Sequence, residues 1–276
     1  MKFALMSLDF KRLPLEDCFR MAKEYGMDGV EIFCSRRHLH LPTFGREEAE
    51  EILAYRKKYG VEIPMLTPST LGKDVCLCSD DPAERADGIA IYKLGIDAAQ
   101  RLEVPRVLVT ADHPGYFRDT DEIWSTLVES VAELASYAEP RGVRVIIEPV
   151  TPMESPVVTT AGDCARLIRE VGSPALGAML EIVPPVVVHE PISQYFQLLG
   201  ERMEYVHICN TDGVTDAHLR LEEGVLPIPD DLNTLAHHGY EGFVTTELYT
   251  ENYRDPELLL SNTARVLGQI RRELSI

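Results

Sequence analysis

Three glutamates and one histidine in the second half of the chain have the side-chain chemistry and the spacing of a metal site. They are Glu148, Glu181, His207 and Glu247, and consecutive members are separated by 33, 26 and 40 residues. Each stands at or near the end of a short hydrophobic segment that is typical of a buried strand. Because the carboxyl ends of successive parallel strands meet at one face of a barrel, these four side chains are expected to converge.

Converging carboxylates need a positive partner, because an ionised carboxylate that leaves water without one costs several kcal/mol. The nearby sequence offers few such partners, since Arg220 is the only Lys or Arg between Glu204 and Arg254. A divalent metal ion is the simpler partner. Three carboxylates and an imidazole, with no thiolate, favour one hard or borderline ion: Mn²⁺ is expected, with Mg²⁺, Co²⁺, Zn²⁺ or Ni²⁺ as alternatives.

Other polar residues near the predicted strand ends are candidates for contact with a substrate. His113 follows the fourth hydrophobic segment, and Glu154 lies in the loop after the fifth. Asp216 and His218 are two residues apart, so an extended backbone would direct both side chains to the same side. Glu31, also near a strand end, is interpreted as a helix cap or a surface ion pair.

The composition is that of an ordinary globular protein with an acidic surface. The 276 residues include 27 Lys and Arg against 45 Asp and Glu, which gives a formal charge of −18. This balance argues against a nucleic-acid partner, because phosphate binding depends on clustered Lys and Arg. No apolar run reaches the roughly 18 residues of a membrane span, and Asp9 interrupts the first apolar stretch too early for a signal peptide. The six cysteines show no disulfide framework, so free thiols and a cytoplasmic location are expected.

Eight hydrophobic segments are predicted to be strands, because most are continuous apolar runs like those of strands covered on both faces. These segments are Lys2–Met6, Gly29–Cys34, Val61–Leu66, Pro105–Thr110, Val143–Val150, Leu176–Ile182, Tyr205–Cys209 and Phe243–Leu248. Amphipathic segments between them are predicted to be helices. These are Leu15–Tyr25, Arg46–Tyr59, Asp81–Leu102, Thr120–Ala138, Ala161–Val171, Ile192–Leu199, Asp230–His237 and Pro256–Leu274.

Strands and helices alternate along the whole chain. A phrase made of a helix end, a glycine and a strand recurs, for example in EYGMDGVEI and HHGYEGFVTTEL. Eight units of about 34 residues match the length of βα units. The sequence therefore predicts an α/β fold, a single (β/α)₈ TIM barrel in which residues 1–276 form one domain. A doubly wound open sheet is the alternative, but no GxGxxG follows the first strand.

The order of the four candidate metal ligands is also the order of a known family. Together with the stretches RLPLEDCFRMAKEYGMDGVEIF, EPVTPMESPVV, EPISQYF and GYEGFVTTEL, it resembles the xylose isomerase-like barrels. Within them it is similar to the D-tagatose 3-epimerase group of sugar epimerases and isomerases, and most of all to the branch that acts on fructoselysine. The similarity runs nearly from end to end.

The resemblance implies an isomerase that inverts C3 of a ketose or a fructoselysine-like ketosamine through a cis-enediolate. A divalent ion at the four ligands would polarise the carbonyl next to C3. Glu148 would take the C3 proton on one face, and Glu247 would return a proton on the other. Glu154, His113 and His218 would contact the sugar.

Departures from the family pattern leave the sugar and the reaction open. Glu181 stands where the group usually has Asp, and Pro184 stands where a substrate-binding His is common. One alternative is a metal-dependent dehydratase or aldose–ketose isomerase of a related sugar or inosose. Another is a non-catalytic sugar-binding barrel. In each case the partner is a small sugar, with no nucleic acid and no membrane, and the sequence leaves a homo-oligomer open.

Overall fold

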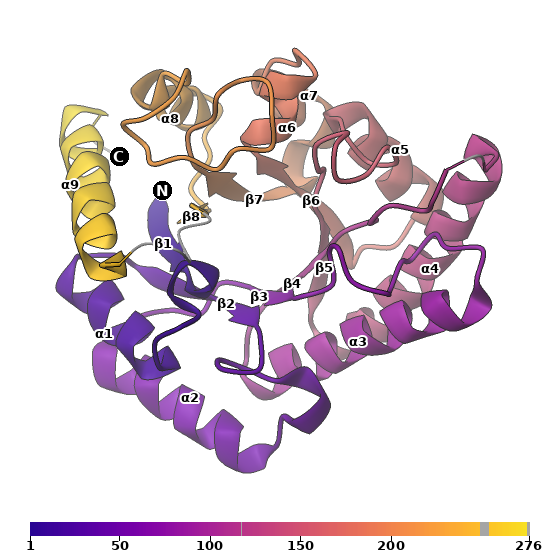
Figure 1. The fold of residues 1–276 in the computed structure, drawn as a ribbon, viewed down its shortest axis with the longest axis horizontal. Helices are drawn as coiled ribbons and strands as arrows, with labels where there is room; N and C mark the ends of the chain where they lie inside the picture. Colours follow the sequence, from indigo (N-terminus) through magenta and orange to yellow (C-terminus); the bar gives the residue numbers. More distant parts are fainter. Residues whose placement is uncertain (117, 249–253, 275–276) are drawn as a thin grey trace.

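The structure, a computed structural model, describes residues 1–116, 118–248 and 254–274. Eight parallel strands in these residues close into a barrel, in which each strand pairs with the next and β1 pairs with β8 (Figure 1). This confirms the predicted (β/α)₈ barrel. The strands are β1 (Lys2–Met6), β2 (Gly29–Cys34), β3 (Leu66–Pro68), β4 (Arg106–Val109), β5 (Arg144–Ile147), β6 (Leu176–Glu181), β7 (Met203–Ile208) and β8 (Phe243–Thr246).

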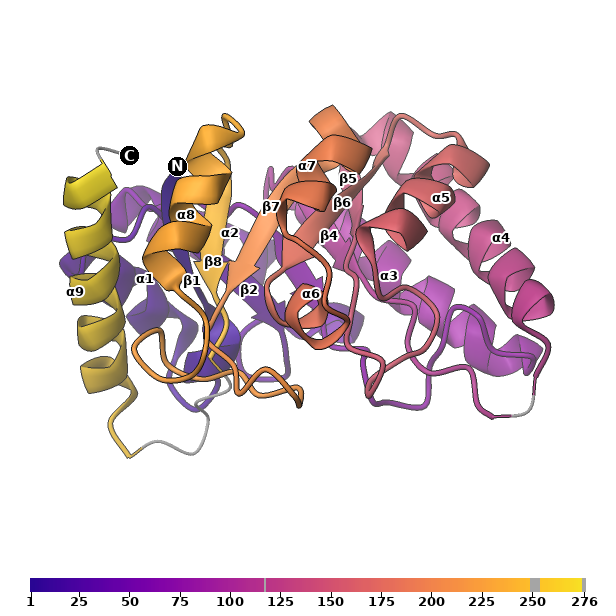
Figure 2. The same ribbon diagram turned by 90° about the horizontal axis from the view of Figure 1, so that it is seen from above.

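Helices cover the outside of the barrel (Figures 1 and 2). They are α1 (Leu15–Glu24), α2 (Arg46–Tyr59), α3 (Pro82–Arg101), α4 (Thr120–Ala138), α5 (Ala161–Val171), α6 (Val183–Val187), α7 (Ser193–Leu199), α8 (Ile228–His237) and α9 (Pro256–Leu274). The sequence did not predict α6. Its prolines stand in the first turn, where a missing backbone N–H breaks no helical hydrogen bond.

The third strand begins later than predicted. The predicted strand Val61–Leu66 is mostly buried, but only Leu66 belongs to β3. Before that point, an isolated bridge joins Glu62 to Gly29 of β2, and the Ile32 N–H donates to the Met65 carbonyl oxygen at 3.2 Å. Pro64 lies between the bridge and the strand and has no N–H to donate to a ladder. The predicted bounds were wrong because burial alone does not make a strand.

An apolar layer fills the inside of the barrel, and a polar layer lies next to it. The apolar layer consists of Ala4, Met65, Leu108, Ile146, Met179, Tyr205 and Phe243. Because side chains alternate along a strand, residues two positions further on point into the barrel again. Glu148, Glu181 and His207 each stand two positions after a member of the apolar layer. The barrel interior therefore becomes polar towards the carboxyl ends of the strands.

The last helix closes the barrel next to the first strand. Strand β1 pairs in parallel with β8, and α9 lies beside α1 (Figure 1). Glu257 of α9 accepts hydrogen bonds from Arg20 and from the Tyr25 hydroxyl. Arg271, in the last turns of α9, donates to Asp28 at 2.7 Å. These contacts join the two ends of the fold across the β1–β8 seam.

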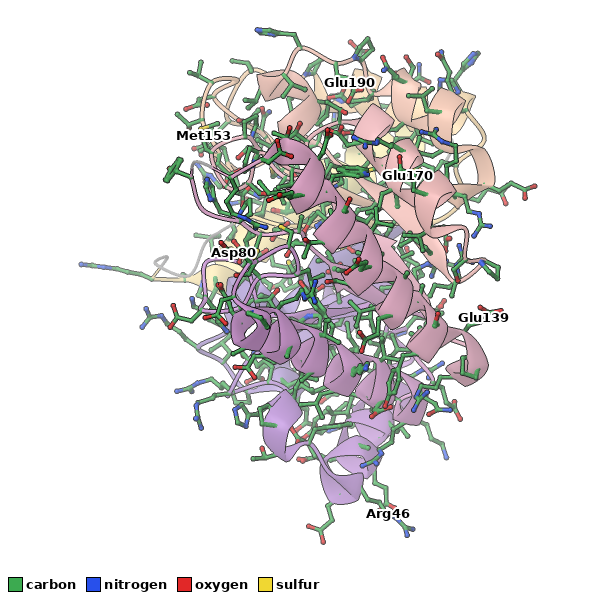
Figure 3. The ribbon with its side chains drawn as sticks, turned by 90° about the vertical axis from the view of Figure 1, so that its right-hand side faces the viewer. Arg46, Asp80, Glu139, Met153, Glu170 and Glu190 are labelled. Atoms are coloured by element: carbon green, nitrogen blue, oxygen red, sulfur yellow. The ribbon has the colours of Figure 1, made fainter. Side chains whose placement is uncertain are left out.

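Charged side chains cover the outer surface. In Figure 3, Arg46, Glu139 and Glu170 project from the helical layer, and all three are exposed. Among the described residues, no helix combines the length and the apolar character that crossing a membrane would need.

Candidate active site

The four predicted metal ligands meet at the carboxyl end of the barrel. Their ligand atoms all lie within 4.8 Å of one another, and all four side chains are buried. The Nδ1 atom of His207 lies 3.0 Å from an oxygen of Glu247, 3.1 Å from Glu148 and 3.5 Å from Glu181. Donor atoms bound to one ion at about 2.1 Å are about 3.0 to 3.4 Å apart, so this spacing fits a shared ion.

The strands hold these side chains at one height. Glu181 is the last residue of β6 and pairs directly with His207 of β7 in the ladder. Glu148 comes immediately after β5, and Glu247 comes immediately after β8. Glu148 and Glu247 thus enter the site from the ends of β5 and β8, and β6 and β7 lie between these two strands.

Glu31, in β2, orients the imidazole of His207. Its two carboxylate oxygens lie 3.1 and 3.0 Å from His207 Nε2, and Oε1 also accepts a hydrogen bond from the Thr67 hydroxyl. A carboxylate accepts hydrogen bonds, so Nε2 donates its hydrogen to Glu31. When a metal ion is bound, Nδ1 would give its lone pair to that ion, and Glu31 would hold the ring in this orientation.

The interpretation of Glu31 as a helix cap or surface group is wrong, because the side chain is fully buried. In the parallel ladder Glu31 pairs with Met6, which lines the cavity at the carboxyl end of the barrel. The sequence contained one signal of this role, namely a charged residue inside an apolar strand. A charged residue in the middle of a continuous apolar strand is costly to bury without a partner, and this cost favours a role in a polar site.

Replacing Glu31 is expected to weaken metal binding without removing a ligand. Glu31→Ala leaves the Nε2–H of His207 without its acceptor, so affinity for Mn²⁺ should fall by about 10- to 100-fold. Glu31→Gln keeps an acceptor oxygen and should recover part of that loss. Calorimetric titration with Mn²⁺ measures both variants, and far-ultraviolet circular dichroism checks that they fold. Wild-type affinity in the folded Ala variant would contradict the positioning role.

Electrostatics in the site favour a cation. Burial raises the pKa of Glu148, and it raises that of Glu181 to about 8. Burial acts on Glu247 as well, but the imidazoles of His207 and His218 hold its pKa below the ordinary value. The Oε2 atom of Glu181 is buried without a hydrogen-bond partner. Several carboxylates around one imidazole, one of them with an unsatisfied oxygen, form a donor set that a divalent ion fits.

A cavity of about 400 Å³ opens beside the four ligands, a size suited to a small organic molecule. Glu154 and His218, two of the candidates for contact with a substrate, both line it. The Glu154 carboxylate accepts hydrogen bonds from the backbone N–H and the hydroxyl of Thr151, at 3.0 and 3.1 Å. Burial and the nearby Asp216 carboxylate raise the pKa of Glu154 to about 8.

His113 does not line this cavity. Its ring packs against Tyr116 with 4.8 Å between the ring centroids, and its Nδ1 accepts a hydrogen bond from the Gly115 N–H. The structure therefore does not bring His113 to the predicted site. The preceding Asp112 contributes to loop structure instead, since its carboxylate accepts a hydrogen bond from the Gly72 N–H at 3.0 Å.

A closed barrel with its polar centre at the carboxyl ends of the strands has the layout of a TIM-barrel enzyme. Residues 19–270 match the xylose isomerase-like TIM barrel family, and the chain belongs to this family. It is 36% identical over 258 residues to fructoselysine 3-epimerase from Shigella flexneri, and the match covers 94% of each chain. The resemblance seen in the sequence is thereby confirmed.

Solved structures share the fold from end to end. A D-tagatose 3-epimerase-like protein superposes with a TM-score of 0.84 at 21% identity, over 100% of this chain and 98% of its own. The IolI protein with a bound zinc atom superposes with a TM-score of 0.81 at 18% identity, over 99% of both chains. At these identities the likeness establishes the shared fold.

Proposed function

We propose that this protein is a metal-dependent epimerase that inverts C3 of a ketose or a fructoselysine-like ketosamine. One observation carries the proposal: Glu148 and Glu247 reach the same buried centre from β5 and from the end of β8. Inversion needs one group to remove a proton on one face and another to return a proton on the other. The relative at 36% identity is a 3-epimerase and supports the same class of enzyme, an isomerase of the epimerase type.

Glu148, Glu181, His207 and Glu247 would hold the ion, and Mn²⁺ is the proposed metal because oxygen donors dominate the set. A bound divalent ion would polarise the substrate's C2 carbonyl and so make the proton on C3 more acidic. Glu31 would keep His207 in the tautomer that binds the ion.

The two glutamates divide the proton transfers. Glu148 accepts the C3 proton, and the electron pair of the broken C–H bond moves into a cis-enediolate of C2 and C3. Glu247, which has taken a proton from solvent, donates it to C3 from the opposite face, and the carbonyl at C2 forms again. Glu148 then releases the proton that it accepted to solvent. The product has the same composition as the substrate and the inverted configuration at C3.

The cavity beside the centre would hold the rest of the substrate. Glu154 would accept hydrogen bonds from groups at C1, and His218, which also lines the cavity, would contact the sugar. The acidic lining and the formal charge of −18 favour a substrate that carries a positive charge, such as the amine of a ketosamine.

Isotope uptake from solvent tests the proposed reaction against its alternatives. The Mn²⁺-loaded protein is incubated in D₂O with free ketoses and with fructoselysine, and products are read by mass and NMR. The expected product is the C3 epimer with one deuterium at C3. An aldose product, with or without deuterium, would identify an aldose–ketose isomerase, and loss of water would identify a dehydratase. Binding with neither exchange nor turnover would identify a non-catalytic sugar-binding barrel.

A further inference from the structure

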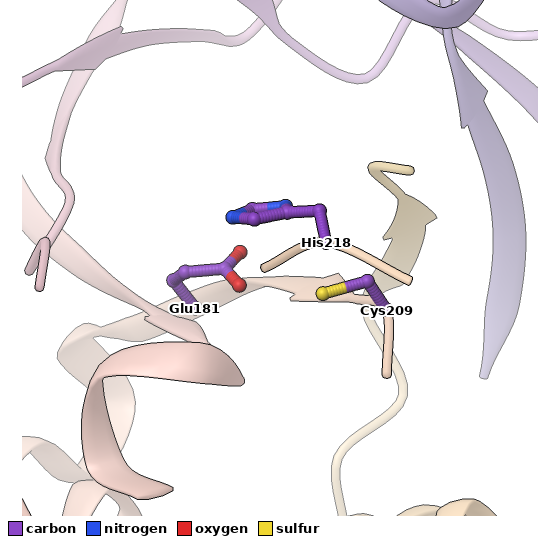
Figure 4. A group of neighbouring side chains, drawn as sticks. All are labelled: Glu181, Cys209 and His218. Carbon is purple, nitrogen blue, oxygen red and sulfur yellow. The ribbon is translucent and has the colours of Figure 1, made fainter. Parts of the chain in front are cut away.

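A second group of potential metal ligands lies next to the first and differs from it in containing sulfur. It consists of Glu181, Cys209 and His218, whose ligand atoms lie within 4.8 Å of one another (Figure 4). Tetrahedral zinc with one sulfur and two nitrogen or oxygen ligands places its donors about 3.4 to 3.6 Å apart, so small side-chain rotations would close the group around an ion.

Local backbone structure brings the three side chains together. Glu181 ends β6, and Cys209 comes immediately after β7. Two backbone hydrogen bonds between Asn210 and Leu219, of 2.9 and 2.7 Å, fix the loop that carries His218 against the segment that follows β7. The ligand atoms of Cys209 and His218 lie within 4.8 Å of each other and of a Glu181 oxygen. The group is therefore built into the fold.

The tautomer of His218 suits a metal ligand. Its Nδ1 lies 3.1 Å from the backbone carbonyl oxygen of Glu247, which can only accept, so Nδ1 carries a hydrogen. Metal-binding histidines usually donate their second ring nitrogen in this way, which directs the lone pair of the other nitrogen to the ion. The imidazole side chain is only 4% exposed, so water does not compete freely for Nε2.

Two buried carboxylate oxygens nearby have no hydrogen-bond partner. They are Oε2 of Glu181 and Oδ1 of Asp216, and the latter lies 3.8 Å from His218 Nε2. A buried anionic oxygen without a partner is costly. In the described part of the chain, the cavity lining that contains Glu181 and His218 includes one Lys and no Arg. A divalent cation bound by Glu181, Cys209 and His218 would give the Glu181 carboxylate a partner and would offset the charge of the neighbouring Asp216.

We propose that Glu181, Cys209 and His218 form a second divalent metal site, with Asp216 as the neighbouring carboxylate and Glu181 shared with the first site. Its thiolate and imidazole make it a softer site than the oxygen-rich first one, so it takes Zn²⁺ or Co²⁺ in preference to Mn²⁺. On binding, the Cys209 thiol gives its proton to solvent and the thiolate bonds to the ion. No oxidation or reduction is involved. With Nδ1 donating to the Glu247 carbonyl oxygen and Nε2 bound to the ion, His218 would contact a sugar through its ring edge and not through a ring nitrogen.

Cobalt titration of the metal-free protein, under reducing and oxygen-free conditions, tests this inference. Binding to a thiolate produces a strong sulfur-to-cobalt charge-transfer absorption in the near ultraviolet, whereas carboxylates and imidazole do not. We expect two equivalents of Co²⁺ to bind, with the thiolate absorption belonging to one of them. One equivalent of Zn²⁺ should remove that absorption.

Two cysteine variants make the test specific. Cys209→Ser should bind one equivalent and lose the thiolate absorption. Cys164→Ser, which changes another fully buried thiol on α5, should behave as wild type. One equivalent without the absorption in wild type, or an unchanged absorption in folded Cys209→Ser, would overturn the inference. If Cys209→Ser does not fold, Cys76→Ser is titrated beside the wild type, because Cys76 and Cys78 form the other close pair of thiols, 3.5 Å apart. Absorption that persists in Cys76→Ser supports the inference, and its loss there overturns it. The Co²⁺ equivalent without thiolate absorption reports on the first metal site, and the deuterium experiment reports on the epimerase reaction. Failure of the second site is therefore distinguishable from failure of the proposed function.

Discussion

Replacing Glu148 or Glu247 by glutamine is expected to lower epimerisation by at least about a hundredfold, because each variant loses one of the two proton-transfer groups. Glutamine keeps the size of the side chain and one oxygen donor, but it has no carboxylate to accept a proton. Turnover is measured with Mn²⁺ after the metal content of each variant has been determined. Glu47→Gln, at an exposed position of α2, is the matched control and should keep full turnover.

Isotope exchange distinguishes loss of one base from general damage to the site. With one base left, the C3 epimer whose hydrogen faces that base should still exchange it with D₂O, but the centre should not invert. Glu148→Gln should therefore exchange the C3 hydrogen of one epimer with solvent, and Glu247→Gln should exchange that of the other epimer. A variant that kept more than about a tenth of wild-type turnover would have an activation barrier raised by less than about 1.4 kcal/mol. That result would contradict the acid–base role of the replaced glutamate.

Removing divalent metal is expected to reduce turnover by more than about a hundredfold and to lower the melting temperature. Metal chemistry contributes several kcal/mol to such a proton abstraction. An ion at 100 times its dissociation constant stabilises the folded state by about 2.7 kcal/mol. That corresponds to about 5 to 10 °C at roughly 2 to 4 °C per kcal/mol. Calorimetric scans before and after chelation, and after addition of Mn²⁺, measure the shift.

The His207→Ala variant is the control for the stability effect. It removes the central donor, so its melting temperature should respond little to Mn²⁺. Full turnover in protein shown by elemental analysis to contain no metal would contradict the proposed metal dependence.

The barrel could be predicted because its local signals agree. Continuous apolar runs, glycines after helices and a regular repeat length all indicate the same fold, and β1 and β2 begin and end as predicted. The convergence of Glu148, Glu181, His207 and Glu247 could be predicted for a geometric reason, since strands of a barrel end at one face.

Other features depend on contacts that no local pattern encodes. The partnership of Glu31 with His207 joins β2 to β7, far apart in the chain and across the barrel interior. The place of His113 depends on the path of an irregular loop, where periodicity gives no information. Cys209 lacked a predicted role because its neighbour His218 reaches it through a loop held by a single β-bridge.

The seam between β1 and β8 has a consequence for how the chain leaves the ribosome. Strand β1 pairs with β2 on one edge and with β8 on the other, and β8 is synthesised about 240 residues after β1. At a translation rate of about 5 to 20 residues per second, β1 keeps one unpaired edge for roughly 10 to 50 seconds. An open edge of this kind can pair with other chains. The contacts of Glu257 with Arg20 and Tyr25 form only after α9 has been synthesised, so the nascent barrel stays open until β8 and α9 have emerged.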